Sequence, residues 1–217
     1  MKLFIDSANV ETIGNLVPLR IVDGITTNPS LLAMEPGEPM DTLRRICDVV
    51  NGPVSAEVVA TDAEAMVGEG RQLAAIHEHI VVKVPFGKEG IKACAALASE
   101  GVRVNVTLVF SASQALLAAK VGATFVSPFV GRLDDLATEG MGLIGQIVEI
   151  YENYEFTTEV LVASVRGPVH VVEAARLGAD ICTCPPKVIE MLFNHPLTDI
   201  GLKKFLADWE KAQALKT

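Results

Sequence analysis

The sequence is poor in aromatic and in basic residues. Aromatic side chains make up 5% of the 217 residues, and Lys and Arg total 18 against 27 Asp and Glu, which gives a formal net charge of −9. An acidic chain is not attracted to a phosphate backbone, so we expect no nucleic-acid partner. A small phosphate ester is still a possible ligand, because one or two well-placed arginines bind phosphate whatever the net charge of the protein.

Cysteine and histidine are scarce too. The chain has four cysteines, and the pair Cys182 and Cys184 forms a C-x-C without any paired C-x-x-C spacing, so we expect reduced, buried thiols rather than a zinc site. No metal site is expected from the histidines, because they do not fall at the ends of predicted strands together with carboxylates. These histidines are His77, His79, His170 and His195.

Two cofactor motifs and a long apolar run are absent. No G-x-G-x-x-G follows the first predicted strand and no G-x-x-x-x-G-K-[ST] occurs, so neither dinucleotide nor P-loop chemistry has support. The apolar stretch between Lys2 and Asp6 is too short for a signal peptide or a membrane span. We therefore expect a cytoplasmic protein with no membrane partner.

What the chain does contain is an eightfold alternation of short β-rich runs and longer helical segments. Such alternation predicts parallel strands joined by right-handed crossovers, and eight units of this size close into a (β/α)8 TIM barrel. A doubly wound open sheet is the alternative. We expect one α/β domain over residues 1–217. The runs are KLFID, RIVDGI, VSAEVVA, HIVVKVP, VRVNVTLVF, TFVSPF, TEVLVAS and ADICTC.

Two helical segments have recognisable features. Residues 61–78 show apolar residues at helical spacing, with Thr61 or Asp62 placed to cap the start. An extra C-terminal helix is expected at about residues 197–215, where Ile200, Phe205 and Trp209 belong to an apolar stripe. That stripe needs a partner surface, which is either the barrel itself or a neighbouring subunit.

Polar residues interrupt the apolar strands near their C-terminal ends. In a closed barrel these ends meet at one mouth, where such folds keep their chemistry. Each residue also has an ordinary structural explanation as a cap, a turn residue or a donor to the backbone. The set comprises Asp6, Thr26, Thr27, Asn28, Glu57, Lys83, Asn105, Thr107, Ser127, Arg132, Ser164 and Arg166.

Glu57 and Lys83 are the most informative of these residues, because charged side chains are almost never buried unless they are paired or used. A desolvated lysine favours its neutral amine, which attacks a carbonyl to form a Schiff base. Asp6 and Glu57 are the available acid/base groups, and a water held between Glu57 and Thr107 would serve imine formation and hydrolysis. Two arginines after adjacent strands, at positions 132 and 166, favour a phosphate site.

Seven motifs, in order along nearly the whole chain, resemble the small transaldolases, the branch that includes fructose-6-phosphate aldolase. They are FIDSAN, GITTNPSLL, EVVATDAEAM, IVVKVP, NVTLVFSASQA, SPFVGRLDD and ASVRGP. The resemblance implies a (β/α)8 barrel without metal or organic cofactor, acting on sugar phosphates in the non-oxidative pentose phosphate pathway. It further implies a homo-oligomer, a decamer of two pentamers, with the C-terminal helix crossing to a neighbour.

The resemblance also implies roles for individual residues. Lys83 would form the Schiff base, Asp6 would act as the acid/base at the bond that breaks, and Glu57 would work with Thr107 on the catalytic water. The substrate would be held by Thr27, Asn28, Asn105, Ser127, Phe129 and Ser164, and its phosphate by Arg132 and Arg166.

Two positions distinguish the branches of that family. Fructose-6-phosphate aldolases typically have glutamine and tyrosine where this chain has Glu57 and Phe129. The pair resembles transaldolase, which passes the dihydroxyacetone unit to an aldose phosphate instead of releasing it to water. An aldolase that releases dihydroxyacetone is the first alternative, and a barrel that binds sugar phosphates without catalysis is the second.

Overall fold

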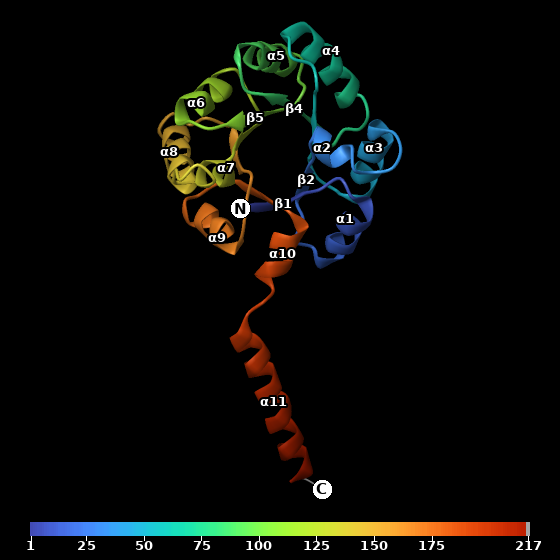
Figure 1. The fold of residues 1–217 in the computed structure, drawn as a ribbon, viewed down its shortest axis with the longest axis vertical. Helices are drawn as coiled ribbons and strands as arrows, with labels where there is room; N and C mark the ends of the chain where they lie inside the picture. Colours follow the sequence, from blue (N-terminus) through green and yellow to red (C-terminus); the bar gives the residue numbers. More distant parts are fainter. Residues whose placement is uncertain (216–217) are drawn as a thin grey trace.

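The computed structural model describes residues 1–215 and contains eight strands. They are β1 (Lys2–Asp6), β2 (Gly24–Thr26), β3 (Val54–Glu57), β4 (Ile80–Pro85), β5 (Val104–Val109), β6 (Phe125–Pro128), β7 (Glu159–Val162) and β8 (Ile181–Cys184). All neighbours pair in parallel, and β1 pairs with β8, so the sheet closes into a barrel in chain order (Figure 1). The expectation of a (β/α)8 barrel is confirmed.

Helices surround the barrel, and a short 3-10 turn, η1 (Val17–Leu19), follows the first of them. The helices are α1 (Val10–Leu16), α2 (Pro29–Leu32), α3 (Pro39–Val49), α4 (Ala63–Ala74), α5 (Lys88–Ser99), α6 (Ala112–Lys120), α7 (Val130–Asp134), α8 (Gly140–Asn153), α9 (Pro168–Arg176), α10 (Pro186–Leu192) and α11 (Pro196–Ala214). Asp62 caps α4 by accepting a hydrogen bond from the Ala65 N–H, as the sequence predicted.

The barrel interior is filled in two layers because side chains along a strand alternate between its two faces. A separate apolar cluster, which includes Phe4, Val81, Phe125 and Ile181, fills the lower layer. Gly24 belongs to the same layer, since a Cβ on it would lie 2.6 Å from the ring of Phe4. Two residues further along four of these strands come Asp6, Lys83, Ser127 and Thr183, so the polar groups form the layer above.

The second strand is shorter and later than the expected RIVDGI run. The preceding 3-10 turn ends at Arg20 in the left-handed conformation (φ 58°), which takes the chain out of extended geometry. Asp23 then bonds the first strand twice, through its carboxylate to the Leu3 N–H at 2.8 Å and through its own N–H to the Leu3 carbonyl at 2.9 Å. Pairing as a strand therefore begins at Gly24.

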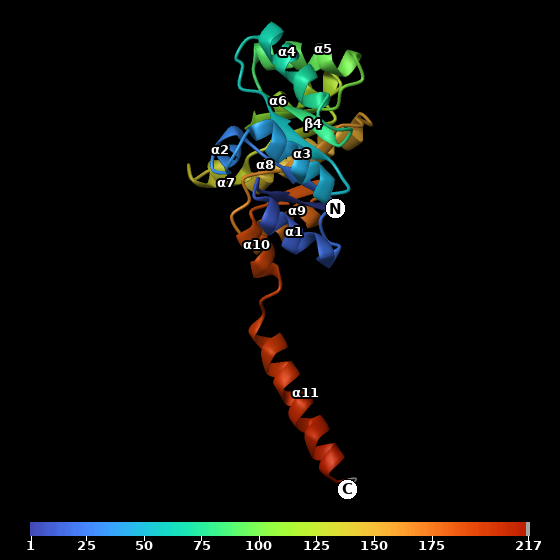
Figure 2. The same cartoon turned by 90° about the vertical axis from the view of Figure 1, so that its right-hand side faces the viewer.

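The last helix leaves the barrel altogether (Figures 1 and 2). No residue of α11 is buried, and Phe205 and Trp209 are 71% and 63% exposed. Of the two partners left open by the sequence, the helix does not use its own barrel. Among residues 1–215, no helix is long and apolar enough to cross a membrane.

Candidate active site

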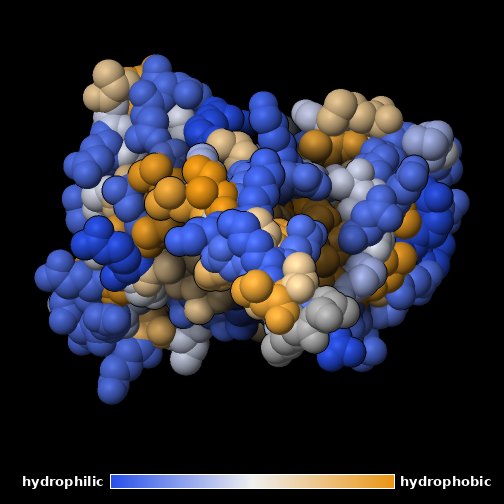
Figure 3. All heavy atoms as spheres, turned by 90° about the horizontal axis from the view of Figure 1, so that it is seen from below, coloured by the Kyte–Doolittle hydropathy of each residue, from blue (hydrophilic) through white to orange (hydrophobic). Residues whose placement is uncertain are grey.

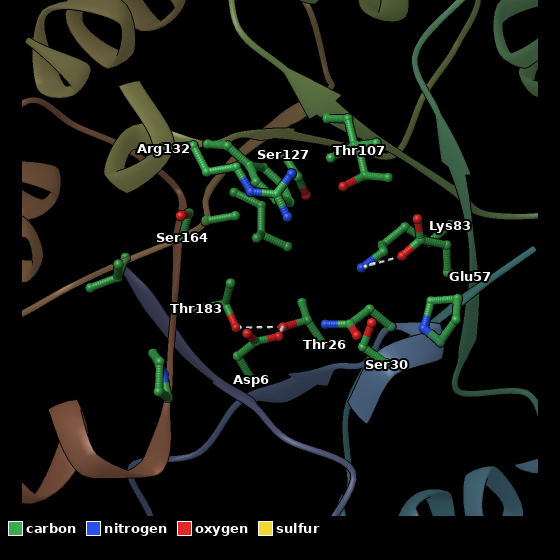
Figure 4. A pocket seen from close by; sticks show the side chains of 18 of the residues that line it. Asp6, Thr26, Ser30, Glu57, Lys83, Thr107, Ser127, Arg132, Ser164 and Thr183 are labelled. Carbon is green, nitrogen blue, oxygen red and sulfur yellow. Dashed lines mark hydrogen bonds and ion pairs between the residues drawn. The ribbon is translucent and has the colours of Figure 1, made fainter. Parts of the chain in front are cut away.

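A cavity of about 530 Å³ opens at the C-terminal mouth of the barrel, directly above the apolar layer (Figure 4). Ten of the twelve residues predicted for the site line it: Asp6, Thr26, Asn28, Glu57, Lys83, Thr107, Ser127, Arg132, Ser164 and Arg166. Phe129, which the resemblance added to the site, lines it as well. The mouth collects these residues from most of the barrel because each follows the apolar residues of its own strand.

Lys83 and Glu57 form a buried ion pair. They stand opposite each other in the β3–β4 register, so their side chains leave the sheet on the same face. Lys83 Nζ lies 3.0 Å from Glu57 Oε2 and donates to the Thr27 carbonyl at 2.6 Å, and the two side chains are only 6% and 15% exposed. Lys83 Nζ therefore has a carboxylate and a backbone carbonyl within reach, so the buried group is paired and not isolated. Glu57 is in place to accept the proton that Lys83 must lose before it can attack a carbonyl.

Asp6 ends β1 beside the same cavity. Burial raises the pKa of its carboxyl above the ordinary value, and the hydrogen bond from Thr26 and the positive charge of Lys83 oppose that shift only in part. Thr26 Oγ1 donates to Asp6 Oδ1 at 2.7 Å. A carboxyl with a raised pKa binds a proton more readily near neutral pH, which suits a group that takes up and returns protons.

Thr107 carries an unpartnered hydroxyl at the cavity wall. Its Oγ1 is the one buried side-chain polar atom of the described residues that has no hydrogen-bond partner. The register of β5 shifts between Val106 and Val109, and Leu108 adopts the left-handed conformation (φ 58°), so the strand bulges at this point. Thr107 and Leu108 both line the cavity as a result, and the free hydroxyl has a bond to offer a water or a substrate.

Two residues expected to hold substrate are engaged with neighbouring protein groups. Asn105 accepts from Ser127 Oγ at 2.7 Å and donates to Ser55 Oγ at 3.1 Å, so it supports Ser127. The Thr27 hydroxyl donates to the Ser55 carbonyl at 2.7 Å, and Thr27 meets Lys83 only through its backbone oxygen. Neither lines the cavity. The register places Asn105 opposite Lys83, so its side chain leaves the sheet on the same face, and sequence spacing could not show that Ser127 and Ser55 engage it.

Asn28 combines a structural and a site role. Its Oδ1 caps α2 by accepting from the Leu31 N–H at 2.9 Å, as a turn residue before proline would. The residue also lines the cavity, and among the described residues no acceptor takes a hydrogen bond from its Nδ2. The side-chain amide is therefore free to donate to a ligand.

The two arginines approach the cavity from its rim. The Arg132 guanidinium carbon lies 4.9 Å from the centre of the Phe129 ring, and Figure 4 shows the Arg132 side chain extending over the pocket. Arg166 Nη2 donates to Asp135 Oδ2 at 2.6 Å, in a pair whose side chains are more than half exposed. An exposed pair contributes little to stability, so a phosphate dianion can replace the Asp135 carboxylate.

The segments that carry these arginines are packed tightly together. Gly131 donates its N–H to the Ser164 carbonyl at 3.1 Å, and a Cβ on Gly131 would meet that same oxygen. His170 joins them as well, with its Nδ1 accepting from the Arg166 N–H at 3.2 Å and its Nε2 lying 2.9 Å from Asp134. His170 thus links α9 to Asp134 of α7 at the rim, away from the strand ends. Within residues 1–215 no cluster of His, Cys, Asp or Glu could hold a metal ion.

Sequence reasoning missed two residues of the cavity wall and underrated a third. Thr183 and Ser30 line the cavity without having been singled out, and Thr26 was seen only as one polar residue after the second run. The run ICTC did contain a signal for Thr183, because alternation along the strand places its side chain on the other face of the sheet from those of Cys182 and Cys184. Those cysteines are free and buried, as predicted, with their sulfurs 3.7 Å apart.

Comparisons with known proteins show the family of the chain. A sequence model of the family described as transaldolase/fructose-6-phosphate aldolase matches residues 3–216. A probable transaldolase of Myxococcus xanthus is 62% identical over 97% of this chain and 95% of its own length. Probable transaldolases of Aquifex aeolicus and Methanococcus maripaludis are 59% and 57% identical, each over 97% of this chain and at least 97% of their own length. The chain belongs to the transaldolase/fructose-6-phosphate aldolase family.

Proposed function

We propose that this protein is a transaldolase. It would transfer a dihydroxyacetone unit from a ketose phosphate, fructose 6-phosphate or sedoheptulose 7-phosphate, to an aldose phosphate, erythrose 4-phosphate or glyceraldehyde 3-phosphate. The observation that carries the proposal is the buried Lys83–Glu57 pair, which shares its cavity with the raised-pKa carboxyl of Asp6. A cytoplasmic role in the pentose phosphate pathway belongs to the same proposal.

Schiff-base formation begins at the ion pair. Glu57 takes a proton from the Lys83 ammonium across 3.0 Å, and the neutral amine attacks the C2 carbonyl of the ketose. The carbonyl oxygen leaves as water, so that ammonium and ketone become a protonated imine and one water molecule. The free hydroxyl of Thr107 supplies one hydrogen bond to that water, and Glu57 supplies the acid and base.

Bond cleavage uses Asp6. Its carboxylate removes the proton from the C4 hydroxyl while the electrons of the C3–C4 bond move into the protonated imine, leaving an enamine on Lys83 and releasing an aldose phosphate. Addition to an acceptor aldehyde reverses these steps, with Asp6 returning the proton. Arg132 and Arg166 would hold the phosphate at the rim, because guanidinium groups match phosphate oxygens in pairs.

Two residues support transfer over release of free dihydroxyacetone. Phe129 lines the cavity and packs edge to face against Phe110 with ring centres 5.9 Å apart, so it gives the catalytic water no hydroxyl. Glu57 stands where fructose-6-phosphate aldolases typically have glutamine. The lack of a hydroxyl at Phe129 disfavours hydrolysis of the enzyme-bound dihydroxyacetone relative to its capture by an acceptor.

The test is intact-protein mass after incubation with fructose 6-phosphate and borohydride, together with an assay for free dihydroxyacetone. We expect one dihydroxyacetone adduct on the wild type, none on Lys83→Met, and product only when an aldose phosphate is present. Free dihydroxyacetone at a comparable rate would favour the aldolase instead. If the wild type binds phosphate esters but carries no adduct, the remaining interpretation is a barrel that binds sugar phosphates without catalysis.

The protein would work as a homo-oligomer in which a second copy covers α11. This helix exposes Leu197, Ile200, Phe205, Leu206 and Trp209, while α9 and α10 expose Val169, Val172, Met191 and Leu192. Figure 3 views the molecule from below and shows apolar side chains gathered on the surface that faces the viewer. Burial of such large side chains drives association, so we expect a solution mass of several subunits, of which five or ten would match a ring. A mass of one subunit would contradict this.

A further inference from the structure

A chain of three side chains links β8, β2 and β1 at the cavity. Thr183 Oγ1 lies 2.7 Å from Thr26 Oγ1, which in turn lies 2.7 Å from Asp6 Oδ1 (Figure 4). Both threonines are 3% exposed, so bulk water does not compete for these bonds. The three residues also line the cavity, although nothing in their sequence positions relates residue 183 to residues 6 and 26.

The number of hydroxyl protons fixes which residue donates in each of these hydrogen bonds. A threonine hydroxyl has one proton to donate and two lone pairs to accept with, whereas an ionised carboxylate only accepts. The Thr26 proton must therefore go to Asp6 Oδ1, and the short contact between the two hydroxyls must use the proton of Thr183. Among the described residues nothing donates to Asp6 Oδ2.

We propose that Thr183 is a positioning residue: it donates to Thr26, which fixes Thr26 as the donor to Asp6 Oδ1 and leaves Oδ2 as the carboxylate oxygen that accepts the substrate proton. The inference deepens the proposed function, because Oδ2 would be the atom that takes the C4 hydroxyl proton. When Oδ2 is protonated, Oδ1 still accepts from Thr26, so the two hydrogen bonds need no rearrangement during turnover.

A second consequence concerns the substrate. The proton of Thr183 is already committed to Thr26, so Thr183 can accept a hydrogen bond from a sugar hydroxyl but cannot donate one. Aligned hydroxyls strengthen one another by polarisation, roughly 10–30% per bond, so loss of Thr183 weakens the bond between Thr26 and Asp6 without removing it.

Other titratable groups near Asp6 stay as they are in this arrangement. Lys83 on β4 interacts electrostatically with Asp6 and is itself paired with Glu57. The Cys184 thiol on β8 interacts with Asp6 too, and its pKa is raised by its contact with Cys182 and by burial, so it remains neutral. Neither group changes in the variants below.

The experiment follows the Asp6 carboxyl by infrared titration of protein labelled with 13C at the aspartate carboxyls, with Asp6→Asn subtracted to isolate the band. Thr183→Val keeps the shape but loses the hydroxyl, so we expect the pKa of Asp6 to rise because its carboxylate is less well stabilised. Thr26→Val should raise it further. Thr183→Ser keeps the donor and should titrate as the wild type.

Kinetics supply the second readout. Because ionised Asp6 is needed as a base, a raised pKa moves the acid limb of the kcat/KM profile to higher pH. We expect a two- to fourfold loss for Thr183→Val, which is about what partial loss of one polarising donor gives, and a loss of about tenfold or more for Thr26→Val. Thr158→Val is the matched control, since the buried Thr158 hydroxyl bonds the Ala123 carbonyl far from the cavity.

The outcomes separate the two proposals. An unchanged Asp6 titration in both Thr183→Val and Thr183→Ala would overturn the role of Thr183, even if the wild type is an active transaldolase. A shifted titration in a protein without transaldolase activity would support the hydroxyl chain and contradict the proposed function. The alanine variant also covers the case in which Thr183→Val does not fold.

Discussion

Two regions of this molecule depart from the usual rule that charged side chains are exposed and large apolar side chains are buried. They differ in whether the described residues compensate the energetic cost. The barrel mouth buries the charged groups of Lys83 and Glu57, whereas α11 exposes large apolar groups such as Phe205 and Trp209. In the mouth, the opposite charge comes from the next strand of the same chain. For α11, the described residues provide no cover. The charges of the first region are thus paired within the chain, whereas the apolar face of the second stays exposed among the described residues.

The largest effect is expected when one of the paired charges is removed from the mouth. Lys83→Met should abolish the borohydride-trapped adduct and lower kcat by about 10⁴-fold or more, because the nucleophile is gone. It should also destabilise the barrel by ~3 kcal/mol, since Glu57 then loses its buried partner. Thermal and denaturant unfolding would measure this.

The matched control for that prediction removes both charges. Lys83→Met/Glu57→Gln leaves no unpaired charge, so we expect it to regain most of the stability while remaining inactive. If the double variant is no more stable than the single one, the ion pair does not offset the burial of Glu57.

A substitution at Asp6 tests whether the residues of the mouth lower the stability of the fold in exchange for activity. Asp6→Asn should lower kcat by about 10²- to 10⁴-fold, the usual contribution of a positioned acid/base group. At neutral pH it should raise stability by about 0.5–2 kcal/mol, because burial penalises the ionised carboxylate and not the neutral amide. Thermal unfolding of both proteins across pH provides the measurement.

The sign of the pH dependence follows from the raised pKa of Asp6. Between the unfolded value of 3.8 and the raised folded value the native state binds more protons, so stability falls as pH rises through this window. Above the window the loss is constant. The advantage of Asp6→Asn should therefore shrink as pH falls toward 3.8, and an advantage that is constant with pH would contradict the shift.

The rim arginines share a property with each region: they are charged, like the groups of the mouth, and exposed, like the side chains of α11. Arg166→Ala should raise KM for a phosphorylated acceptor by about 10-fold, from the loss of a charge-assisted hydrogen bond, with little change in kcat. Unphosphorylated glyceraldehyde serves as the control substrate, and its KM should not move. Equal losses on both substrates would place Arg166 outside the phosphate site.

The smallest effect on activity is expected at α11. Phe205→Asp/Trp209→Asp should lower the solution mass measured by light scattering, because charges prevent the apolar face from being buried. Since the mouth draws all its residues from one chain, activity should stay within about threefold of the wild type. Lys204→Ala, a polar change on the same helix, should leave the mass unaltered.

Much of the fold was readable from the sequence because periodicity is a local property. All eight predicted strands exist, and Asp62 caps its helix, since β-branched runs and capping side chains act over a few residues. The start of the second strand was predicted four residues too early, because the left-handed Arg20 and the bonds of Asp23 to the first strand are not visible as a hydrophobic pattern.

The site was predicted in its residue types more than in its connections. Alternation by itself determined that Asp6, Lys83 and Ser127 stand two residues above apolar neighbours, and so at the barrel mouth. Only closure of the barrel decided that Lys83 pairs with Glu57, that Asn105 bonds Ser127 and Ser55, and that Thr183 reaches Asp6 through Thr26. Side-chain direction along a strand is set locally, whereas contacts between strands depend on register and on the return of β8 to β1.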